Sequence, residues 1–198
     1  MPKPSRKHEF LDSARRLVQA RGFAGTSVDA VCADTGTTKG AFFHYFRDKD
    51  ELGIELLDYF RKSSRAALRA GNHGAEGDPR RRLQRYLDHL GSVYAADLRF
   101  RDGCLFAIFA FETADPGSEV RRMCAAAIDE WLAAATAELK AIFSLNRARP
   151  GVRPRELAEL LLVSVEGALI LSRTTGGRGA MTRSLGHFRR YVQSLMGL

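Results

Sequence analysis

Few of the features that build disulfide frameworks, metal centres or membrane spans occur in this chain of 198 residues. The three cysteines, Cys32, Cys104 and Cys124, are odd in number and their spacings match no zinc site, so we expect neither disulfides nor a metal. No run approaches the roughly 18 consecutive apolar residues of a membrane-spanning helix, so no membrane partner is expected. Six prolines and the absence of strand-like runs favour an all-α fold.

Catalytic signatures are missing as well. The sequence has no glycine-rich phosphate loop, no HExxH pair and no nucleophile elbow. Glu112 and Glu166 are isolated acids in apolar runs, either ligand partners or locally satisfied groups. We therefore predict that the chain is not an enzyme and holds no cofactor. A helical enzyme that carries a DNA-binding head stays as an alternative, which a turnover assay tests.

The charge balance is positive, with 31 Lys and Arg against 23 Asp and Glu and a formal net charge of +8. An excess of this sign favours a polyanionic partner such as nucleic acid. Basic residues also occur far from the N-terminus, for example at residues 80–82, so charge supports DNA binding without locating it. Residues 1–9 lack the apolar core of a signal peptide, and we expect a cytoplasmic protein.

The most informative stretch is Thr26–Leu52, where two short helical segments are separated by a glycine. Thr26 or Ser27 suits the N-cap of the first segment, and Gly36 ends it in the manner of a C′ glycine. The second segment, expected at Thr38–Tyr45, follows almost at once. Two short helices joined by a tight turn predict a helix-turn-helix whose second helix reads DNA.

The same stretch resembles a known family. Gly36–Phe46, GTTKGAFFHYF, and then Asp48–Leu52, DKDEL, are similar to the signature of TetR-type transcriptional regulators, with glycines, aromatics and a lysine in register over about a quarter of the chain. The resemblance implies an all-α protein of about nine helices. Its N-terminal three-helix DNA-binding domain would span residues 1–47, with the helix-turn-helix at about 28–47. Residues 48–198 would form a helical effector-binding and dimerisation domain.

The resemblance and the outward positions assign DNA contacts to particular residues. Phosphates would be held by Thr26, Tyr45 and Lys49. Base edges would be read by Thr38, Lys39, Gly40, Phe43 and His44. Thr37 is either a base reader or a packing substitute for valine, and Phe43 stands where tyrosine is common in the family. Ala41, Phe42 and Phe46 are expected to face the core of the small domain, as is Phe23.

Apolar periodicity and turn signals place the remaining helices. They are expected at about 8–21, 48–70, from Pro79, at 104–111, 118–143, from Pro154, and at 181–196. By resemblance, helices four to seven would enclose an effector cavity, with core packing as the alternative for each aromatic residue. The candidate lining residues are Phe60, Tyr94, Cys104, Phe106, Phe109, Phe111 and Trp131.

Cys104 is also a candidate sensor. It follows Arg101, Asp102 and Gly103 at an expected helix N-terminus, where the dipole and the arginine favour the thiolate. The run GCLFAIFAFETAD resembles a TetR branch whose members include regulators of the response to quinones and aldehydes. The alternatives are a sensor that reacts with electrophiles or oxidants and a small buried thiol that packs as an apolar group.

The last two helices combine leucines with small residues, which permit close helix approach. In the family these helices pair across a two-fold axis, and the alternative is an intramolecular core. The expected interface residues are Leu161, Ser164, Gly167, Ala168, Leu185, Phe188 and Val192. Together these patterns predict a homodimeric repressor that binds a palindromic double-stranded operator and is released by an unknown small-molecule effector. A repressor switched through Cys104 is the alternative.

Overall fold

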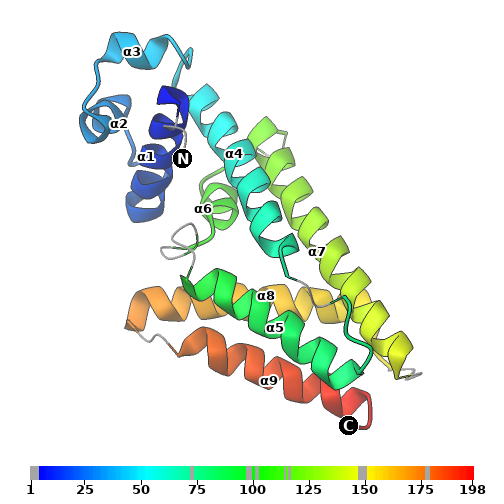
Figure 1. Cartoon of the computed structure of the whole chain (residues 1–198). Coiled ribbons are helices and arrows are strands. Elements are labelled where there is room, and N and C mark those ends of the chain that lie inside the picture. Colours follow the sequence, from blue (N-terminus) through cyan, green and yellow to red (C-terminus); the bar gives the residue numbers. More distant parts are fainter. Residues whose placement is uncertain are drawn as a thin grey trace. The chain divides into compact units, whose positions relative to one another are not determined.

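The computed structural model describes residues 5–71, 74–96, 100, 103–113, 115, 117–146, 151–176 and 179–198. All regular structure in these ranges is helical, which confirms the all-α prediction (Figure 1). The helices are α1 (Arg6–Arg21), α2 (Val28–Thr35), α3 (Lys39–Phe43), α4 (Lys49–Arg69), α5 (Pro79–Ala96), α6 (Leu105–Glu112), α7 (Glu119–Leu145), α8 (Pro154–Thr175) and α9 (Ala180–Leu195). Arg101 and Asp102, invoked above beside Cys104, lie outside the described residues.

Short-range polar contacts explain where these helices begin. Asp48 Oδ1 accepts the Glu51 amide at 2.8 Å, and Asp78 Oδ1 accepts the Arg81 amide at 2.8 Å, so each aspartate caps the helix that follows it. Pro154 is the first residue of α8, where the preceding Arg153 amide donates to Glu156 Oε2 at 3.0 Å. These starts agree with the predicted ones because caps are local signals.

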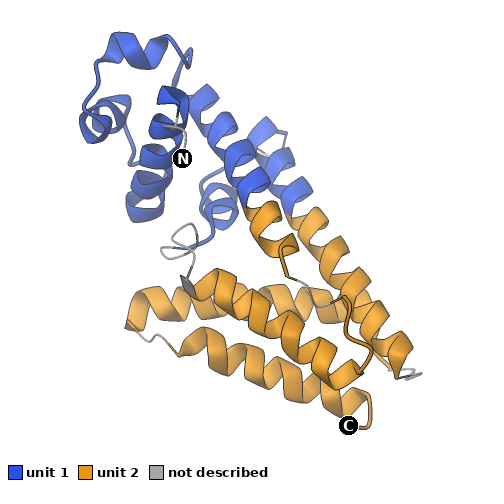
Figure 2. Ribbon diagram, viewed as in Figure 1, with its two compact units in different colours: residues 1–63, 102–127 blue, residues 64–101, 128–198 orange. Residues whose placement is uncertain are grey.

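The chain forms two compact units (Figure 2). The first comprises residues 1–63 and 102–127, and the second comprises residues 64–101 and 128–198. Helices α4 and α7 each contribute to both units. The expected division into domains at 1–47 and 48–198 follows function rather than compactness and stays a prediction.

The core of the first unit is aromatic. The ring of Phe10 meets those of Phe42 and Phe46 edge to face, with centroids 5.7 and 6.0 Å apart, and all three side chains are buried. Phe42 and Phe46 thus face the core, as predicted, whereas Ala41 is half-buried. The prediction for Phe23 is wrong, because its ring stacks instead on Phe109 of α6, 4.7 Å away.

A polar contact joins α1 to α2 in the same unit. The buried Ser13 hydroxyl and the Arg16 guanidinium each lie 2.6 Å from Asp34 Oδ2. The hydrogen bond from Ser13 and then the charge of Arg16 lower the pKa of Asp34. The carboxylate therefore fastens the first helix of the helix-turn-helix to the helix that precedes it.

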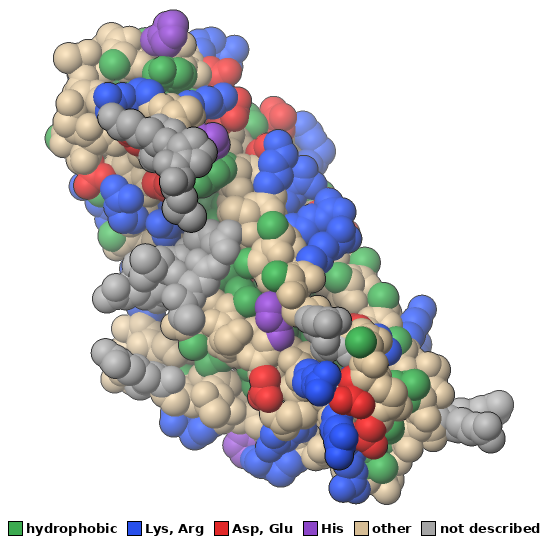
Figure 3. Space-filling view, viewed as in Figure 1, with side chains coloured by type: hydrophobic (Ala, Val, Ile, Leu, Met, Phe, Trp, Pro, Cys, Tyr) green, Lys and Arg blue, Asp and Glu red, His purple; other side chains and the backbone are tan. Residues whose placement is uncertain are grey.

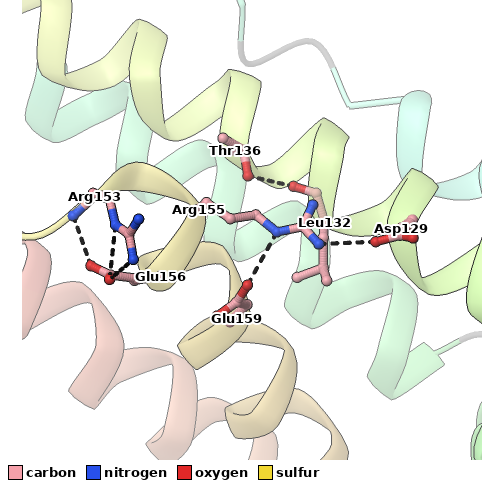
Figure 4. A network of polar contacts seen from close by, with 7 residues as sticks. All are labelled: Asp129, Leu132, Thr136, Arg153, Arg155, Glu156 and Glu159. Carbon is pink, nitrogen blue, oxygen red and sulfur yellow. Dashed lines mark hydrogen bonds and ion pairs between the residues drawn. The ribbon is translucent and has the colours of Figure 1, made fainter.

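The second unit is held by apolar packing between α8 and α9 and by ion pairs (Figure 1). Arg82 of α5 binds Glu138 of α7 through Nε and Nη2 at 2.7 and 3.0 Å. Arg155 joins α8 to α7 by a 2.9 Å contact with Asp129 and also contacts Glu159 on its own helix (Figure 4). The bidentate Arg82 pair is the better shielded, since both of its side chains are largely buried.

Most of the predicted dimer residues lie in the intramolecular core of this unit. Leu161, Ala168, Leu185, Phe188 and Val192 are each at most 6% exposed within one chain. The expectation that these five side chains face a partner is therefore wrong. Their helical period was correctly identified, but it marks faces that are buried within the chain, where α9 packs against both α8 and α5. Ser164 and Gly167 are half-buried.

Candidate nucleic-acid interface

The segment from Ser27 to Phe46 folds as a helix-turn-helix for local reasons. Ser27 caps α2 by accepting the Ala30 amide at 3.2 Å, which resolves the choice between Thr26 and Ser27. Gly36 ends α2 in the left-handed conformation, with φ 62° and ψ 36°. Thr38 then caps α3 by accepting the Ala41 amide at 3.2 Å. Two caps and one left-handed glycine make the turn tight.

Helix α3 presents a mixed polar and aromatic face to solvent. Its outer residues Thr38, Lys39, Gly40, Phe43, His44 and Tyr45 are exposed, with Phe43 at 53% and Tyr45 at 37%. The helix is shorter than the predicted Thr38–Tyr45 because the Tyr45 amide bonds the Phe42 carbonyl at 2.9 Å, which tightens the last turn. The outward side chains still include hydroxyl, cationic and flat aromatic groups, which suit phosphates and base edges.

Gly40 occupies a position where the protein fold leaves room for a side chain. A Cβ added there would meet only Thr38 Oγ1 among the described atoms, at 3.8 Å, which is ordinary van der Waals contact. Gly40 also lies within α3, away from the left-handed region that favours glycine. Neither packing within the protein nor backbone conformation therefore requires a glycine here. A glycine also permits close approach by another molecule, and the DNA contact expected of Gly40 stays a prediction.

Lys39, the first residue of α3, is paired with Asp29 of α2. Its Nζ lies 2.8 Å from Asp29 Oδ1, and both side chains are well exposed. The hydrogen bond and charge of Asp29 raise the pKa of Lys39, so the ammonium stays charged at neutral pH. A DNA phosphate or base edge would have to compete with Asp29 for this ammonium.

Two predicted phosphate ligands have structural roles. Thr26 is 2% exposed and donates its hydroxyl to the Gly22 carbonyl at 2.8 Å, so the expected phosphate contact by its side chain is wrong. Lys49 Nζ donates to the Ala24 carbonyl at 3.3 Å and lies 4.5 Å from the centre of the Phe23 ring. An ammonium has three donors, so a phosphate contact by Lys49 stays a prediction.

Thr37 remains between its two interpretations. Its hydroxyl lies 2.8 Å from that of Thr35, and the side chain is half-buried.

The distribution of charge does not locate the DNA-binding surface, because Lys and Arg side chains lie over both compact units on the face drawn in Figure 3.

The first unit also contains a groove between α4, α6 and α7. Its volume is about 340 Å³, and it is lined by Leu57, Arg61, Phe106, Glu119, Arg122, Met123 and Ala126. Of the predicted ligand residues, only Phe106 lines it. The four α7 residues recur at helical spacing on one face, a signal in the sequence that the emphasis on aromatic residues missed.

The other predicted ligand residues lie elsewhere. Phe60 and Phe109 are 1% exposed and belong to the core, while Phe111 is 90% exposed. In the second unit, Trp131 donates its indole N–H to the Tyr94 hydroxyl at 3.1 Å. That hydrogen bond satisfies the polar part of the tryptophan within the protein, as the core-packing alternative requires.

Cys104 is the N-cap of α6, as predicted, and is 9% exposed. Burial raises the pKa of the Cys124 thiol to about 11, which agrees with a structural role for that residue.

No group of three or more His, Cys, Asp or Glu in the described ranges is placed to hold a metal ion. None of the helices in those ranges is long and apolar enough to cross a membrane.

Comparison with known proteins agrees with this geometry. Residues 10–56 match the family model of bacterial regulatory proteins of the tetR family, and residues 79–184 match the C-terminal domain of LmrA/YxaF-like transcriptional regulators. The HTH-type transcriptional regulator LmrA of Bacillus subtilis (strain 168) is 24% identical over 173 residues, covering 85% of this chain and 86% of that protein. The HTH-type transcriptional repressor DhaR of Mycobacterium sp. (strain GP1) is 25% identical, covering 84% and 81%.

A solved structure is similar over nearly the whole chain. It is a TetR transcriptional regulator from Chloroflexus aurantiacus J-10-FL, with a TM-score of 0.81 and 26% identity over 94% of this chain and 93% of that one. These relatives are transcriptional regulators and not enzymes. With a helix-turn-helix at its N-terminal end and family matches to both parts, the chain belongs to the TetR family of DNA-binding transcriptional regulators.

Proposed function

We propose that this regulator is a repressor that binds a palindromic operator as a homodimer and leaves it when a small molecule binds the groove between α4, α6 and α7. The observation that carries the proposal is the outer face of α3, where Gly40 has open space around it and polar and aromatic side chains are exposed. The relative DhaR is named a repressor, which favours the same sign of regulation.

An apolar stripe on α8 supports the dimer. Four large apolar side chains of α8 are exposed: Leu160 (42%), Val163 (68%), Ile170 (60%) and Leu171 (53%). Together with Gly167 they recur at helical spacing. Exposed apolar side chains in one row mark an interaction surface. Pairing of this stripe with the same stripe of a second copy would give the assembly two α3 helices, the number that a palindromic site requires.

The groove indicates the chemistry of the effector. Apolar contacts come from Leu57, Phe106 and Met123, and the charged lining consists of two guanidinium groups, Arg61 and Arg122, and one carboxylate, Glu119. Arg61 also pairs with Asp58 at 3.2 Å, and Arg122 donates to the Gly117 carbonyl. Guanidinium groups bind carboxylates in bidentate fashion. The effector would therefore combine an apolar body with an acidic group. The earlier candidate residues other than Phe106 are not carried into this site.

Release would follow from linkage. The effector must bind more tightly to a state in which the two α3 helices fit the operator poorly, and the operator then weakens effector binding by the same factor.

The experiment begins with the selection of duplexes that the protein binds from a random DNA library. In footprinting of a selected duplex, the region that the protein protects from cleavage should contain two symmetric half-sites. Apolar carboxylic acids are then screened for release of the selected duplex. A hit should lose potency in Arg122→Ala while operator affinity is kept. An asymmetric single site, or no selected duplex at all, would refute the proposed function.

One observation favours a second candidate. Cys104 is the N-cap of α6, and α6 also lines the groove through Phe106. Modification of that thiol by an electrophile or oxidant would then replace reversible effector binding. Unchanged release by quinones in Cys104→Ser would remove this candidate.

A further inference from the structure

Glu112, the last residue of α6, holds the turn that precedes the helix-turn-helix. Its Oε1 accepts the Phe23 amide at 3.1 Å, and its Oε2 accepts the Ala24 amide at 2.7 Å. These residues are 89 and 88 positions away in the sequence. Charge-assisted hydrogen bonds that the two amides donate to both carboxylate oxygens fix distance and orientation together, which a single contact does not.

The turn is shaped to accept this carboxylate. Gly22 ends α1 with φ 80°, and a Cβ there would clash with Glu112 Oε1. Phe23 stacks on Phe109 of α6, and both rings pack over Gly53 of α4, where an added Cβ would lie 2.8 Å from Phe23 Cζ. The two glycines therefore make room for α6 and for the side chain that meets it.

The other end of α6 is tied to α1. The Gln19 side chain is 1% exposed and donates from Nε2 to the Gly103 carbonyl at 2.7 Å, just before α6 begins. Gln19 Oε1 in turn accepts from Arg15 at 3.0 Å, which fixes the orientation of the amide. Both ends of this eight-residue helix thus bond to the reading head, defined here as α1 to α3 and their connecting turns.

The middle of α6 lines the groove. Phe106 contributes to its wall and contacts Phe60 of α4 at a centroid distance of 5.3 Å. The groove, α6 and the reading head all belong to the first compact unit. A ligand that displaced Phe106 would move α6, and Glu112 joins the end of that helix to the Phe23–Ala24 turn.

We propose that Glu112 is a positioning residue that transmits occupancy of the groove to the DNA-reading helices. The inference rests on the proposed function, since it specifies how the groove regulates operator binding. Glu112 acts through two backbone amides and need not touch either DNA or effector.

The test is a double-mutant cycle that needs no identified effector. Ala126→Trp fills the groove with a permanent indole, and operator affinity is measured on the selected duplex for the native protein, Ala126→Trp, Glu112→Gln and the double variant. Glutamine keeps the shape of glutamate but only one acceptor oxygen. Ala126→Trp should weaken binding about 5- to 50-fold in the native background and less than about 2-fold in the Glu112→Gln background, a coupling in the usual allosteric range.

Two controls separate transmission from general effects. Glu55→Gln removes a half-buried acid of the same unit, which pairs with Lys7 at 3.0 Å, and should leave the effect of Ala126→Trp intact. Hydrogen exchange of the Phe23 and Ala24 amides should accelerate in Glu112→Ala and not in Glu55→Gln. Met123→Trp is a second way of filling the groove if Ala126→Trp does not fold.

Each outcome has a definite meaning. A groove-filling variant that weakens binding equally with and without Glu112, or that has no effect in the native background, overturns the inference. Unchanged exchange of the two amides in Glu112→Ala overturns it as well. Failure of the native protein to select any duplex would instead refute the proposed function.

Discussion

Replacing Gly40 by alanine separates the requirements of the fold from those of DNA binding. An added Cβ lies 3.8 Å from its nearest described neighbour, so the substitution introduces no clash within the protein. Alanine favours a helix over glycine by up to about 1 kcal/mol in helix interiors. Gly40 lies near the start of the five-residue α3, where we expect about half of that gain.

The effect on DNA should have the opposite sign. If Gly40 lets the α3 backbone approach a phosphate or base edge, the added methyl group forces the helix outward. Loss of one direct contact in a specific interface costs about 1–3 kcal/mol. We therefore expect operator affinity to fall by roughly 10- to 100-fold at fixed salt, while the free energy of unfolding stays equal or rises slightly.

Gly36→Ala is the matched control, since it makes the same chemical change four residues earlier. Gly36 has open space around it but a φ of 62°, where a Cβ costs about 1–2 kcal/mol. This variant should unfold at lower denaturant concentration. Its folded fraction should bind DNA more nearly like the native protein.

Guanidinium denaturation followed by circular dichroism gives the stabilities, and fluorescence anisotropy of a labelled operator at about 150 mM salt gives the affinities. Native affinity in Gly40→Ala would show that DNA does not approach this backbone. A clear loss of stability in the same variant would show that the fold itself requires the glycine.

Three further substitutions test other contacts. Asp29→Asn releases Lys39 and removes a negative charge near α3, so operator affinity should rise severalfold by anisotropy, and an unchanged value would mean that Lys39 does not contact DNA. Val163→Asp places a charge on a side chain that is 68% exposed, so the chain should stay folded while the dimer dissociation constant measured by sedimentation rises at least about 100-fold. Asp34→Asn should lower stability at pH 7 by about 1 kcal/mol or less, because the carboxylate is partly exposed. Since the pKa of Asp34 is lowered in the folded state, its contribution is present above the unfolded pKa of about 3.9 and is lost as pH falls through the folded pKa, so the two denaturation curves should converge below about pH 4.

Much of the helix-turn-helix was predictable because its signals lie within a few residues of their effects. Ser27, Gly36 and Thr38 each act on a neighbour no more than a few positions away. The prediction that Thr26 binds a phosphate was wrong because the position of a residue in the family signature does not indicate whether its side chain is buried. Its hydroxyl bonds the Gly22 carbonyl, a contact set by the turn between α1 and α2.

The C-terminal helices also show that a sequence pattern does not reveal which surface covers a side chain. The spacing of Leu161, Leu185 and Val192 identified an apolar face, but periodicity does not state whether another helix of the same chain or of a partner covers it. The structure shows that helices of the same chain cover these residues, with α9 packed against both α8 and α5. The exposed row that includes Val163 became visible only when that packing was known.

By itself the sequence determined the all-helical fold, the positions of the helix starts and the family, because helical period, caps and turn glycines are local and additive signals. Only the tertiary structure decided that Phe106, and not the other predicted aromatic residues, lines the groove, and that Glu112 meets the amides of Phe23 and Ala24. Such contacts join residues nearly 90 positions apart, and they form when α6 packs against the turn after α1. No period or spacing in a single chain carries that information, since the packing of elements distant in sequence sets it.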